Sequence, residues 1–343
     1  MKVLVTGAGG FLGFEVAKSL VELGHEVTNL SRHHYVSLDA YNIKTIKYDL
    51  GQPSDIDLSG FDAIIHCAAI AGVWGKKESF YQTNYTGAVN LFDLAKKSGV
   101  KYFVYTSTPS VVFGSDDIIL GDESLAYPEK FYTYYAHSKS MAEAYILENS
   151  DDQMQSVALR PHLIWGEGDP HLVPRILAKA RAGALKRVGN GDNLVDIIHV
   201  KNAALAHTLA LNALCSGKDI GGNAYFIGQE RPVNLWEFIN QILHYNDIEP
   251  VEDSVSFSTA YFFGMIFEII FKFLGINKPE PPMTRFVSMQ LAKSHYFSHE
   301  KAKRDFDYEP IISIEEGLEK TFRGESYQFK MQNTLDNLET SND

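Results

Sequence analysis

Short apolar runs alternate with longer segments of helical spacing along the first half of the chain. The runs VLV at 3–5, AII at 63–65 and FVY at 103–105 are almost wholly apolar, as expected for parallel strands buried on both faces. The pattern predicts strands at 2–6, 26–30, 45–48, 63–66, 102–106 and 156–159, and helices at 11–23, 79–97 and 134–148. Strands that alternate with helices indicate crossover connections. We therefore predict an α/β fold with a doubly wound parallel sheet.

The pattern changes after the pair Arg160-Pro161. Strand-like pieces at 196–199 and 224–227 lie among helical stretches such as 202–213 and 235–243. We predict a first domain over residues 1–165 and a smaller lobe built mainly from residues 166–323, with some later segments returning to the first domain. The remaining residues, 324–343, are polar and are expected to fray.

Residues 260–274, AYFFGMIFEIIFKFL, form the most apolar stretch of the second half. A membrane-spanning helix needs about 20 apolar residues, whereas this stretch has 15 and contains Glu268 and Lys272. We therefore expect no transmembrane span. Three interpretations stay open: a buried helix over an apolar pocket, a helix facing a membrane surface or a partner, and a plain core helix.

Composition narrows the class of protein. Of the 343 residues 45% are hydrophobic, which excludes a disordered chain. The net charge of −12 makes nucleic acid an unlikely partner, because an acidic surface repels phosphates. Only Cys67 and Cys215 are present, so we expect no disulfide framework and no metal site. The chain opens on a strand rather than a signal peptide, and we expect a cytoplasmic protein.

A glycine-rich turn follows the first predicted strand and opens the first predicted helix. Gly7 permits a sharp turn, Gly10 permits close approach of a pyrophosphate, and Gly13 permits the helix to pack closely on the sheet. The amides near Phe11 and Leu12 would then meet the phosphates at the positive end of the helix. The spacing in this context predicts a dinucleotide site.

The end of the second strand favours NADP(H) over NAD(H). An NAD site usually places a carboxylate here to accept from the ribose 2′-hydroxyl, but the sequence continues as Ser31-Arg32. The guanidinium of Arg32 is suited to a 2′-phosphate. After the third strand, Asp49 and Leu50 are expected beside the adenine ring.

A tyrosine and a lysine four residues apart carry the candidate chemistry. Tyr135 and Lys139 share one face of the predicted helix 134–148. A neighbouring ammonium would lower the phenol pKa from about 10, so that Tyr135 could exchange a proton with a carbonyl oxygen while a hydride moves. Lys139 would also hold the nicotinamide ribose. A hydroxyl to polarise the same carbonyl is expected from the stretch Thr106–Ser110, where several hydroxyls compete.

These motifs together resemble the extended short-chain dehydrogenase/reductase family over residues 1 to about 323. The resemblance is carried by TGAGGFLG, HCAA at 66–69, Asn84, YTST, YAHSK and LRPHLIWGEGD. Within the family the chain is similar to the 3β-hydroxysteroid dehydrogenase branch. In that branch it resembles NADPH-dependent reductases that convert 2-alkyl-3-oxoalkanoic acids to 2-alkyl-3-hydroxy acids in bacterial long-chain olefin synthesis.

The resemblance assigns roles to individual residues. It implies that Tyr135 is the general acid and Lys139 its partner, and it places Thr108 at the usual catalytic serine position, with Ser107 just before it. It also implies that Pro161 lies along the nicotinamide. The pair Ala68-Ala69 is expected beside the cofactor ribose.

One departure from the family bears on the substrate. Relatives that act on nucleotide sugars place an arginine where this chain has Val195, and an apolar side chain cannot hold a diphosphate. An apolar wall for long alkyl chains is instead expected from Trp74, Phe80, Tyr81, Trp165 and the helix at 261–274. For the substrate carboxylate the candidates are Arg285 and Arg175, although either could be an interlobe salt bridge.

Several alternatives stay open on the sequence alone. The same chemistry could serve a steroid-like or other bulky alcohol, and a nucleotide-sugar epimerase or dehydratase is a weaker possibility. A sensor that binds NADP without turnover is disfavoured by Tyr135 and Lys139. The resemblance also implies a homodimer through residues 79–97 and 134–148, and a complex with other olefin-pathway enzymes. Residues 260–274 could contact a membrane peripherally.

Overall fold

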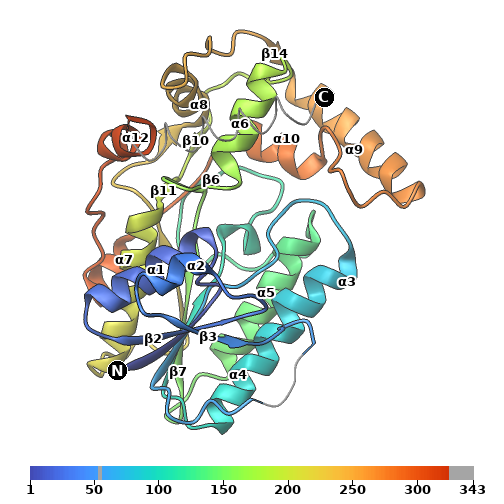
Figure 1. Cartoon of the computed structure of the whole chain (residues 1–343). Coiled ribbons are helices and arrows are strands. Elements are labelled where there is room, and N and C mark those ends of the chain that lie inside the picture. Colours follow the sequence, from blue (N-terminus) through green and yellow to red (C-terminus); the bar gives the residue numbers. More distant parts are fainter. Residues whose placement is uncertain (53–55, 324–343) are drawn as a thin grey trace.

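A seven-stranded parallel sheet forms the centre of the larger lobe (Figure 1). The computed structural model describes residues 1–52 and 56–323, so the predicted fraying of 324–343 lies outside the described residues. The strands are β1 (Lys2–Thr6), β2 (Glu26–Ser31), β3 (Lys44–Lys47), β4 (Ala63–His66), β5 (Tyr102–Thr106), β7 (Gln155–Pro161) and β12 (Asn223–Ile227). Their order is β3-β2-β1-β4-β5-β7-β12. The chain reverses direction across the sheet between β1 and β4, and such a switch point is where doubly wound sheets bind ligands. The predicted fold class is confirmed.

Helices cover both faces of this sheet, as its buried strands require. On one face lie α1 (Phe11–Glu22), α7 (Val200–Cys215) and α11 (Glu300–Phe306), which share a core with Val3, Val5 and Ile65. On the other face α4 (Gly87–Lys97) and α5 (Tyr134–Glu148) pack over Leu4, Ile64 and Phe103. The short helix α2 (Val36–Asp39) follows β2. The helix predicted at 134–148 has the bounds of α5.

The helix predicted at 79–97 is interrupted. It consists of α3 (Lys77–Phe80), a π-helical turn η1 (Tyr81–Thr86) and α4. Such wide turns are rare and are often found at functional sites. Here the turn carries the buried Asn84, whose amide donates to the Ile70 carbonyl (2.9 Å) and whose oxygen accepts from the Ile70 amide (2.7 Å). It also approaches Ser138 Oγ at 3.3 Å, so Asn84 ties the segment after β4 to α5.

The smaller lobe is built around a four-stranded sheet of order β13-β10-β15-β6. Its strands are β6 (Ile118–Gly121), β10 (Leu194–Val195), β13 (Val233–Asn234) and β15 (His295–Phe297), and two-stranded pairs join β8 (Ile164–Trp165) to β11 (Ile198–His199) and β9 (Arg187–Val188) to β14 (Ser254–Val255). The helices are η2 (Pro109–Val111), a 3₁₀ turn next to β5, and α6 (Leu172–Arg181), α8 (Leu235–His244), α9 (Phe257–Phe273), α10 (Arg285–Ala292) and α12 (Ile314–Arg323). The core of this lobe lies among α6, α8 and α12.

The chain passes between the two lobes several times. β6 lies within the range expected for the first domain, yet it pairs with β15 in the smaller sheet. Conversely, β12 adds to β7 at the edge of the large sheet, and α7 packs against α1. The carboxyl ends of the central strands face the smaller lobe, so the candidate site is expected where the two lobes meet (Figure 1).

The apolar helix α9 lies on the surface of the smaller lobe. Its buried residues are Ala260, Gly264 and Glu268, whereas large apolar side chains elsewhere on it are exposed. Two of the three interpretations of 260–274, the helix buried over a pocket and the plain core helix, are therefore wrong. Among the described residues no helix is long and apolar enough to cross a membrane.

Candidate active site

The glycine turn is built as the spacing predicted. Gly7 adopts a φ of +74°, a conformation that favours glycine, and its carbonyl accepts from the Gly10 amide at 2.8 Å. A Cβ on Gly13 would lie 2.1 Å from the Gly7 oxygen, so this helix can approach the strand only with glycine there. α1 begins at Phe11, and its N-cap Gly10 supplies no side chain to cap the first amides. These amides fit an anionic pyrophosphate.

The predicted nucleotide contacts surround the same edge of the sheet. Arg32 is exposed and follows directly after β2. Ala68 lies against the glycine turn, because its backbone is 3.0 Å from a Cβ placed on Gly7 and its amide donates to Thr6 Oγ1 at 3.1 Å. The neighbouring Ala69 is exposed.

Asp49 and Leu50 follow β3 and are both half-buried. Asp49 Oδ1 accepts from the Gly51 amide at 2.9 Å, so this carboxylate stabilises its own turn. The Leu50 carbonyl lies 2.6 Å from a Cβ placed on Gly87 and so contacts the start of α4. Their predicted place beside the adenine ring stays a prediction.

Tyr135 lies in the first turn of α5, close to Thr108. The helix is capped by Thr133, whose hydroxyl accepts from the Ala136 amide at 3.1 Å. Burial raises the pKa of Tyr135 to about 12, although a hydrogen bond with Thr108 opposes this shift. The expected net lowering of this pKa is wrong for the free protein, because desolvation of the phenolate outweighs every favourable interaction.

The competing hydroxyls differ in their hydrogen-bond partners. Thr108 Oγ1 accepts from the Ser110 amide at 3.2 Å, donates to Ser110 Oγ at 3.3 Å and acts on the pKa of Tyr135. Thr106 Oγ1 instead bonds His207 Nε2 (2.8 Å) and Cys67 Sγ (3.3 Å). Ser107 is buried, and its Oγ has no hydrogen-bond partner among the described residues. An unsatisfied hydroxyl beside Thr108 is consistent with the predicted role of Ser107 in binding substrate.

Lys139 lies one turn after Tyr135 and is buried. Its Nζ donates to the Thr106 carbonyl at 2.6 Å and lies 4.0 Å from the centroid of the Tyr105 ring. Desolvation lowers the pKa of Lys139 to about 7, and the nearby charge of Glu143 acts in the opposite direction. Near neutral pH its ammonium is therefore easily deprotonated.

A buried ion pair behind Lys139 was missed by the sequence analysis. Arg160 Nε lies 3.1 Å from Glu143 Oε2, and its Nη2 lies 2.5 Å from Oε1. The Tyr127 hydroxyl donates to Oε1 at 2.7 Å. Glu143 follows Lys139 by one helical turn and Arg160 precedes Pro161 at the end of β7, so the pair joins two predicted parts of the site. The four-residue spacing from Lys139 was the available signal.

The predicted apolar wall is only partly present. Trp74 lies beneath α9, where its Nε1 donates to the Ile276 carbonyl at 2.9 Å and its ring meets Phe271 edge-on. Trp165 has no exposed surface and packs against Phe238 in the core of the smaller lobe. Its assignment to a wall open to substrate was wrong, because β8 points this side chain into the interior.

Both candidate arginines for a substrate carboxylate already have acidic partners. Arg285 Nη2 lies 2.7 Å from Glu268 Oε2, and its backbone amide donates to Oε1 at 2.7 Å. Arg175 pairs with Glu280 at 2.5 Å. Each arginine therefore forms a salt bridge, but within the smaller lobe rather than between the lobes. Binding of a substrate carboxylate by either guanidinium stays a prediction.

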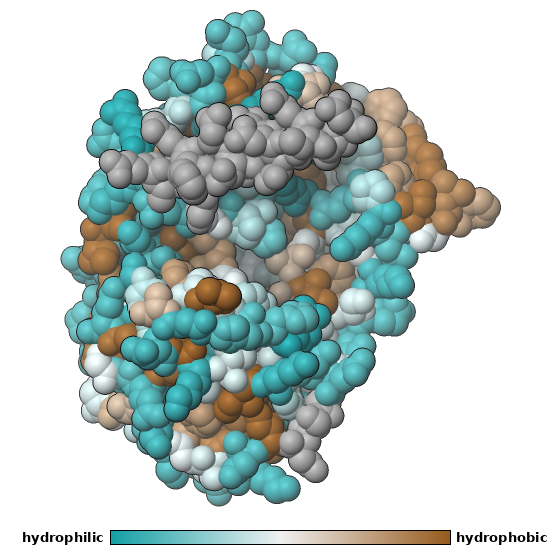
Figure 2. Space-filling model, in the orientation of Figure 1, coloured by the Kyte–Doolittle hydropathy of each residue, from teal (hydrophilic) through white to brown (hydrophobic). Residues whose placement is uncertain are grey.

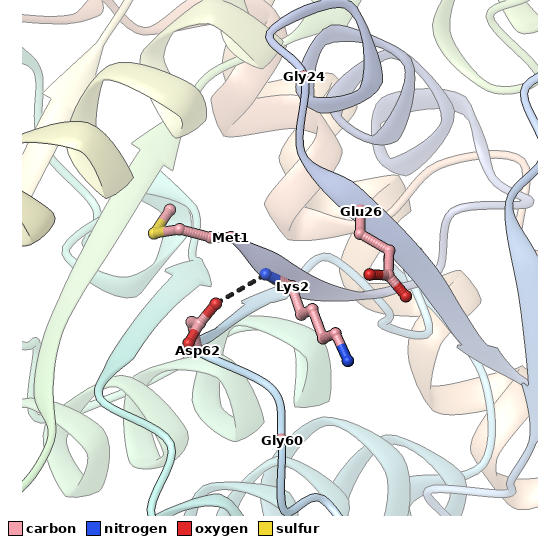
Figure 3. Close-up of a pocket in the computed structure, with 6 residues that line it drawn as sticks. All are labelled: Met1, Lys2, Gly24, Glu26, Gly60 and Asp62. Atoms are coloured by element: carbon pink, nitrogen blue, oxygen red, sulfur yellow. Dashed lines mark hydrogen bonds between the residues drawn. The ribbon is translucent and has the colours of Figure 1, made fainter.

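Two further observations exclude a ligand site at the amino end of β1 and a diphosphate site at Val195. Figure 3 shows a pocket lined by Met1, Lys2, Gly24, Glu26, Gly60 and Asp62, in which the Lys2 amide donates to Asp62 at 2.7 Å. It lies at the amino end of β1, opposite the edge at which parallel sheets bind ligands. Val195 is fully buried in β10, which provides no charge for a diphosphate.

Comparison with known proteins agrees with this geometry. The model of the 3-beta hydroxysteroid dehydrogenase/isomerase family matches residues 4–257. The chain belongs to this family. It is thus an oxidoreductase of the extended short-chain dehydrogenase/reductase type, and the resemblance inferred from the motifs is confirmed.

Individual relatives refine the comparison. The chain is 43% identical to a 2-alkyl-3-oxoalkanoate reductase of Stenotrophomonas maltophilia over 93% of this chain and 98% of the relative. It is 32% identical to the decarboxylating sterol-4-alpha-carboxylate 3-dehydrogenase of Mus musculus, over 93% of this chain and 90% of that protein. A UDP-glucose 4-epimerase from Thermotoga maritima has a similar fold, with a TM-score of 0.73 and 21% identity over 97% of this chain and 100% of that structure.

Proposed function

We propose that this family member reduces the 3-oxo group of a 2-alkyl-3-oxoalkanoic acid to the 3-hydroxy acid with NADPH. The observation that carries the proposal is the placement of Tyr135 and Lys139 one turn apart on α5 at the carboxyl edge of the sheet, where Lys139 Nζ donates to the Thr106 carbonyl at the end of β5 at 2.6 Å. The 43% identity to a 2-alkyl-3-oxoalkanoate reductase supports this substrate. The buried Val195 argues against a nucleotide sugar.

The residues of the site have complementary tasks in this reaction. A nicotinamide cofactor bound beside the glycine turn would supply the hydride for the carbonyl carbon. Tyr135, whose pKa is about 12, is protonated at neutral pH and gives its phenolic proton to the carbonyl oxygen. Thr108 donates a hydrogen bond to the same oxygen and orients it. Lys139, held against the Thr106 carbonyl, supplies the positive charge that stabilises the tyrosinate left behind.

A carboxylate next to the reacting carbon is common to the substrates that the relatives' names describe. In a 2-alkyl-3-oxoalkanoate the carboxyl carbon is bonded to C2, beside the C3 ketone. In a sterol-4-alpha-carboxylate 3-dehydrogenase the acid is on C4, beside the C3 position that reacts. This shared arrangement supports a β-oxo acid as the substrate class. The unpartnered hydroxyl of Ser107 is a candidate donor to that acid.

The cofactor preference rests on Arg32. This side chain is exposed at the end of β2, where an NAD site would carry a carboxylate. A guanidinium pairs bidentately with a phosphate. We infer that Arg32 binds the 2′-phosphate of NADPH.

An absorbance assay at the nicotinamide wavelength tests the proposal. Purified protein is supplied with NADP⁺ and a synthetic long-chain 2-alkyl-3-hydroxy acid, and in parallel with NAD⁺ and with a 3β-hydroxysteroid. We expect NADPH formation from the hydroxy acid and its loss in Tyr135→Phe. Turnover of the steroid alone would contradict the substrate, and turnover with NAD⁺ alone would contradict the role of Arg32.

A carboxylated sterol is the second candidate substrate, because the mouse relative covers the chain as fully as the bacterial one. The two substrates differ in shape, one being rigid and fused and the other flexible. The ratio of kcat/KM for a sterol carboxylate and for an open-chain acid of similar carbon number separates them. We expect the ratio to favour the open-chain acid.

A further inference from the structure

The helix α9 presents a continuous apolar stripe to solvent. Its exposed side chains are Phe262, Phe263, Ile269, Ile270, Phe273 and, just after the helix, Leu274. They recur at helical spacing, and Phe273 is 89% exposed. In Figure 2 the helix forms a hydrophobic projection at the edge of the molecule. A projection of this kind is unusual on a protein that is solvated on all sides.

The opposite side of α9 is held firmly in place. Ala260, Gly264 and Glu268 form its buried stripe. A Cβ on Gly264 would lie 2.7 Å from the Thr284 carbonyl carbon, so α9 packs backbone to backbone against the start of α10. The Glu268 carboxylate accepts hydrogen bonds from the Arg285 guanidinium and from the Arg285 backbone amide. The exposed stripe is therefore the outward face of a fixed helix.

Lysines gather near the C-terminal end of the apolar projection. The segment around Trp74 lies against the end of α9 and the residues after it. Lys272 Nζ lies 5.8 Å from the centroid of the Trp74 ring, and Trp74 Nε1 donates to the Ile276 carbonyl. Those segments carry Lys76, Lys77 and Lys278, all exposed. Glu268 and Glu280 are each paired with an arginine, and Glu78 is exposed among the lysines. Other exposed acids, Glu252 and Asp253, precede the opposite end of α9. This local excess of lysines stands out in a chain of net charge −12.

We propose that α9 docks this protein on an anionic lipid bilayer. Apolar aromatic and aliphatic side chains beside lysines are the signature of a helix that lies in a membrane interface, and each lysine near an anionic surface adds attraction. A second copy of the chain is a poorer occupant, because an isologous contact centred on this projection would bring like-charged lysine clusters together. A projecting helix also suits insertion between lipids.

The docked helix would lie next to the active site. Trp74, which contacts α9, belongs to the segment that follows β4 and the turn at Ala68. Asn84 ties the same segment to α5 through Ile70 and Ser138. This part of the inference rests on the proposed function: a long-chain 2-alkyl-3-oxo acid partitions into lipid, so a docked enzyme would meet its substrate in the bilayer.

Vesicle flotation tests docking independently of activity. The full chain is mixed with vesicles of phosphatidylcholine, with or without phosphatidylglycerol, and bound protein is quantified. We expect binding that increases with phosphatidylglycerol and decreases with salt. Phe273→Glu should weaken binding by about tenfold or more, because an aromatic side chain that would insert into the lipid is replaced by a negative charge that anionic lipid repels. Ile311→Glu, at a residue equally apolar and 66% exposed but far along the chain from α9, is the matched control.

The outcomes separate docking from the reductase proposal. Absence of vesicle binding, or equal losses in Phe273→Glu and Ile311→Glu, would overturn docking whatever the enzyme reduces. Sedimentation of the same variants tests whether a second copy of the chain covers α9 instead. If the parent protein is a dimer that does not bind vesicles, and only Phe273→Glu dissociates it, then α9 is a self-association surface. With a short, water-soluble oxo acid, Phe273→Glu should retain the parent kcat/KM, which shows that the variant is folded.

Discussion

Glu143 and Arg160 form a buried ion pair, with nitrogen and oxygen 2.5 Å apart, one helical turn beyond Lys139. Neither side chain is exposed by more than a few per cent, and burying two charges is costly unless each is fully paired. Glu143 also raises the pKa of Lys139, which burial alone would lower further. The pair thus links the charge state of Lys139 to the strand that ends in Pro161.

The first prediction concerns pH dependence. With the pKa of Lys139 at about 7, its ammonium is lost as the pH rises through neutrality. We expect kcat/KM for NADPH to decrease over that range, because this parameter reports groups of the free enzyme. In Glu143→Gln the ammonium loses a favourable charge, so the decrease should begin at a lower pH. A profile unchanged in the variant would show that Glu143 does not act on Lys139.

The same variant should also be less stable. Removing one partner of a buried pair leaves the other charge unpaired, at a cost of about 3–5 kcal/mol in the free energy of unfolding. Glu148→Gln on the same helix is the control, because Glu148 is exposed. Urea denaturation of both variants measures the difference. Equal stability of the two would mean that Arg160 finds another partner.

Thr108 is expected to act through its hydroxyl. Thr108→Ser keeps the hydroxyl and should retain most of kcat, whereas Thr108→Val removes it at nearly constant volume and should lower kcat by roughly 10²–10³-fold. Single-turnover measurements with saturating NADPH isolate the chemical step. If both variants lost activity equally, the methyl group rather than the hydroxyl would matter at this position, and Ser107 would become the better candidate.

Gly13 should tolerate no side chain. In Gly13→Ala the new Cβ would lie 2.1 Å from the Gly7 oxygen, so α1 must move away from β1. We expect a loss of roughly 1–3 kcal/mol in unfolding free energy, together with weaker NADPH binding. Gly114→Ala provides the comparison, since a Cβ there meets nothing within 4 Å. Thermal denaturation with and without NADPH measures both effects, and a stable Gly13→Ala would contradict the close packing.

Arg32→Ala should discriminate between the two cofactors. Loss of a charge-assisted hydrogen bond to the 2′-phosphate costs about 1.5–3 kcal/mol, so KM for NADPH should increase by about ten- to a hundredfold. KM for NADH should stay nearly constant, because NADH has no such phosphate. Parallel titrations of one preparation give both values. An equal change for both cofactors would indicate that Arg32 contacts the adenine or the ribose instead.

Local signals in the sequence were sufficient for the chemistry-bearing elements. Gly7, Gly10 and Gly13 are within two turns of one another, and their roles follow from a strand, a turn and a helix start that neighbouring residues specify. Tyr135 and Lys139 are brought to one face by helical geometry alone. The alternation of strands and helices likewise predicted the parallel sheet. Each of these depends on residues close in sequence.

Contacts between distant segments were decided only by the tertiary structure. Glu268 and Arg285 belong to different helices, and nothing in either segment identifies its partner. Trp165 is buried because α8 and the smaller lobe close over it, a fact that its own short strand does not determine. The sequence showed that 260–274 is apolar, but the exposure of this helix follows from its packing on α10 through the narrow stripe of Ala260, Gly264 and Glu268. Composition and spacing determine what an element is, whereas the neighbours that fold against it determine which face it shows to water.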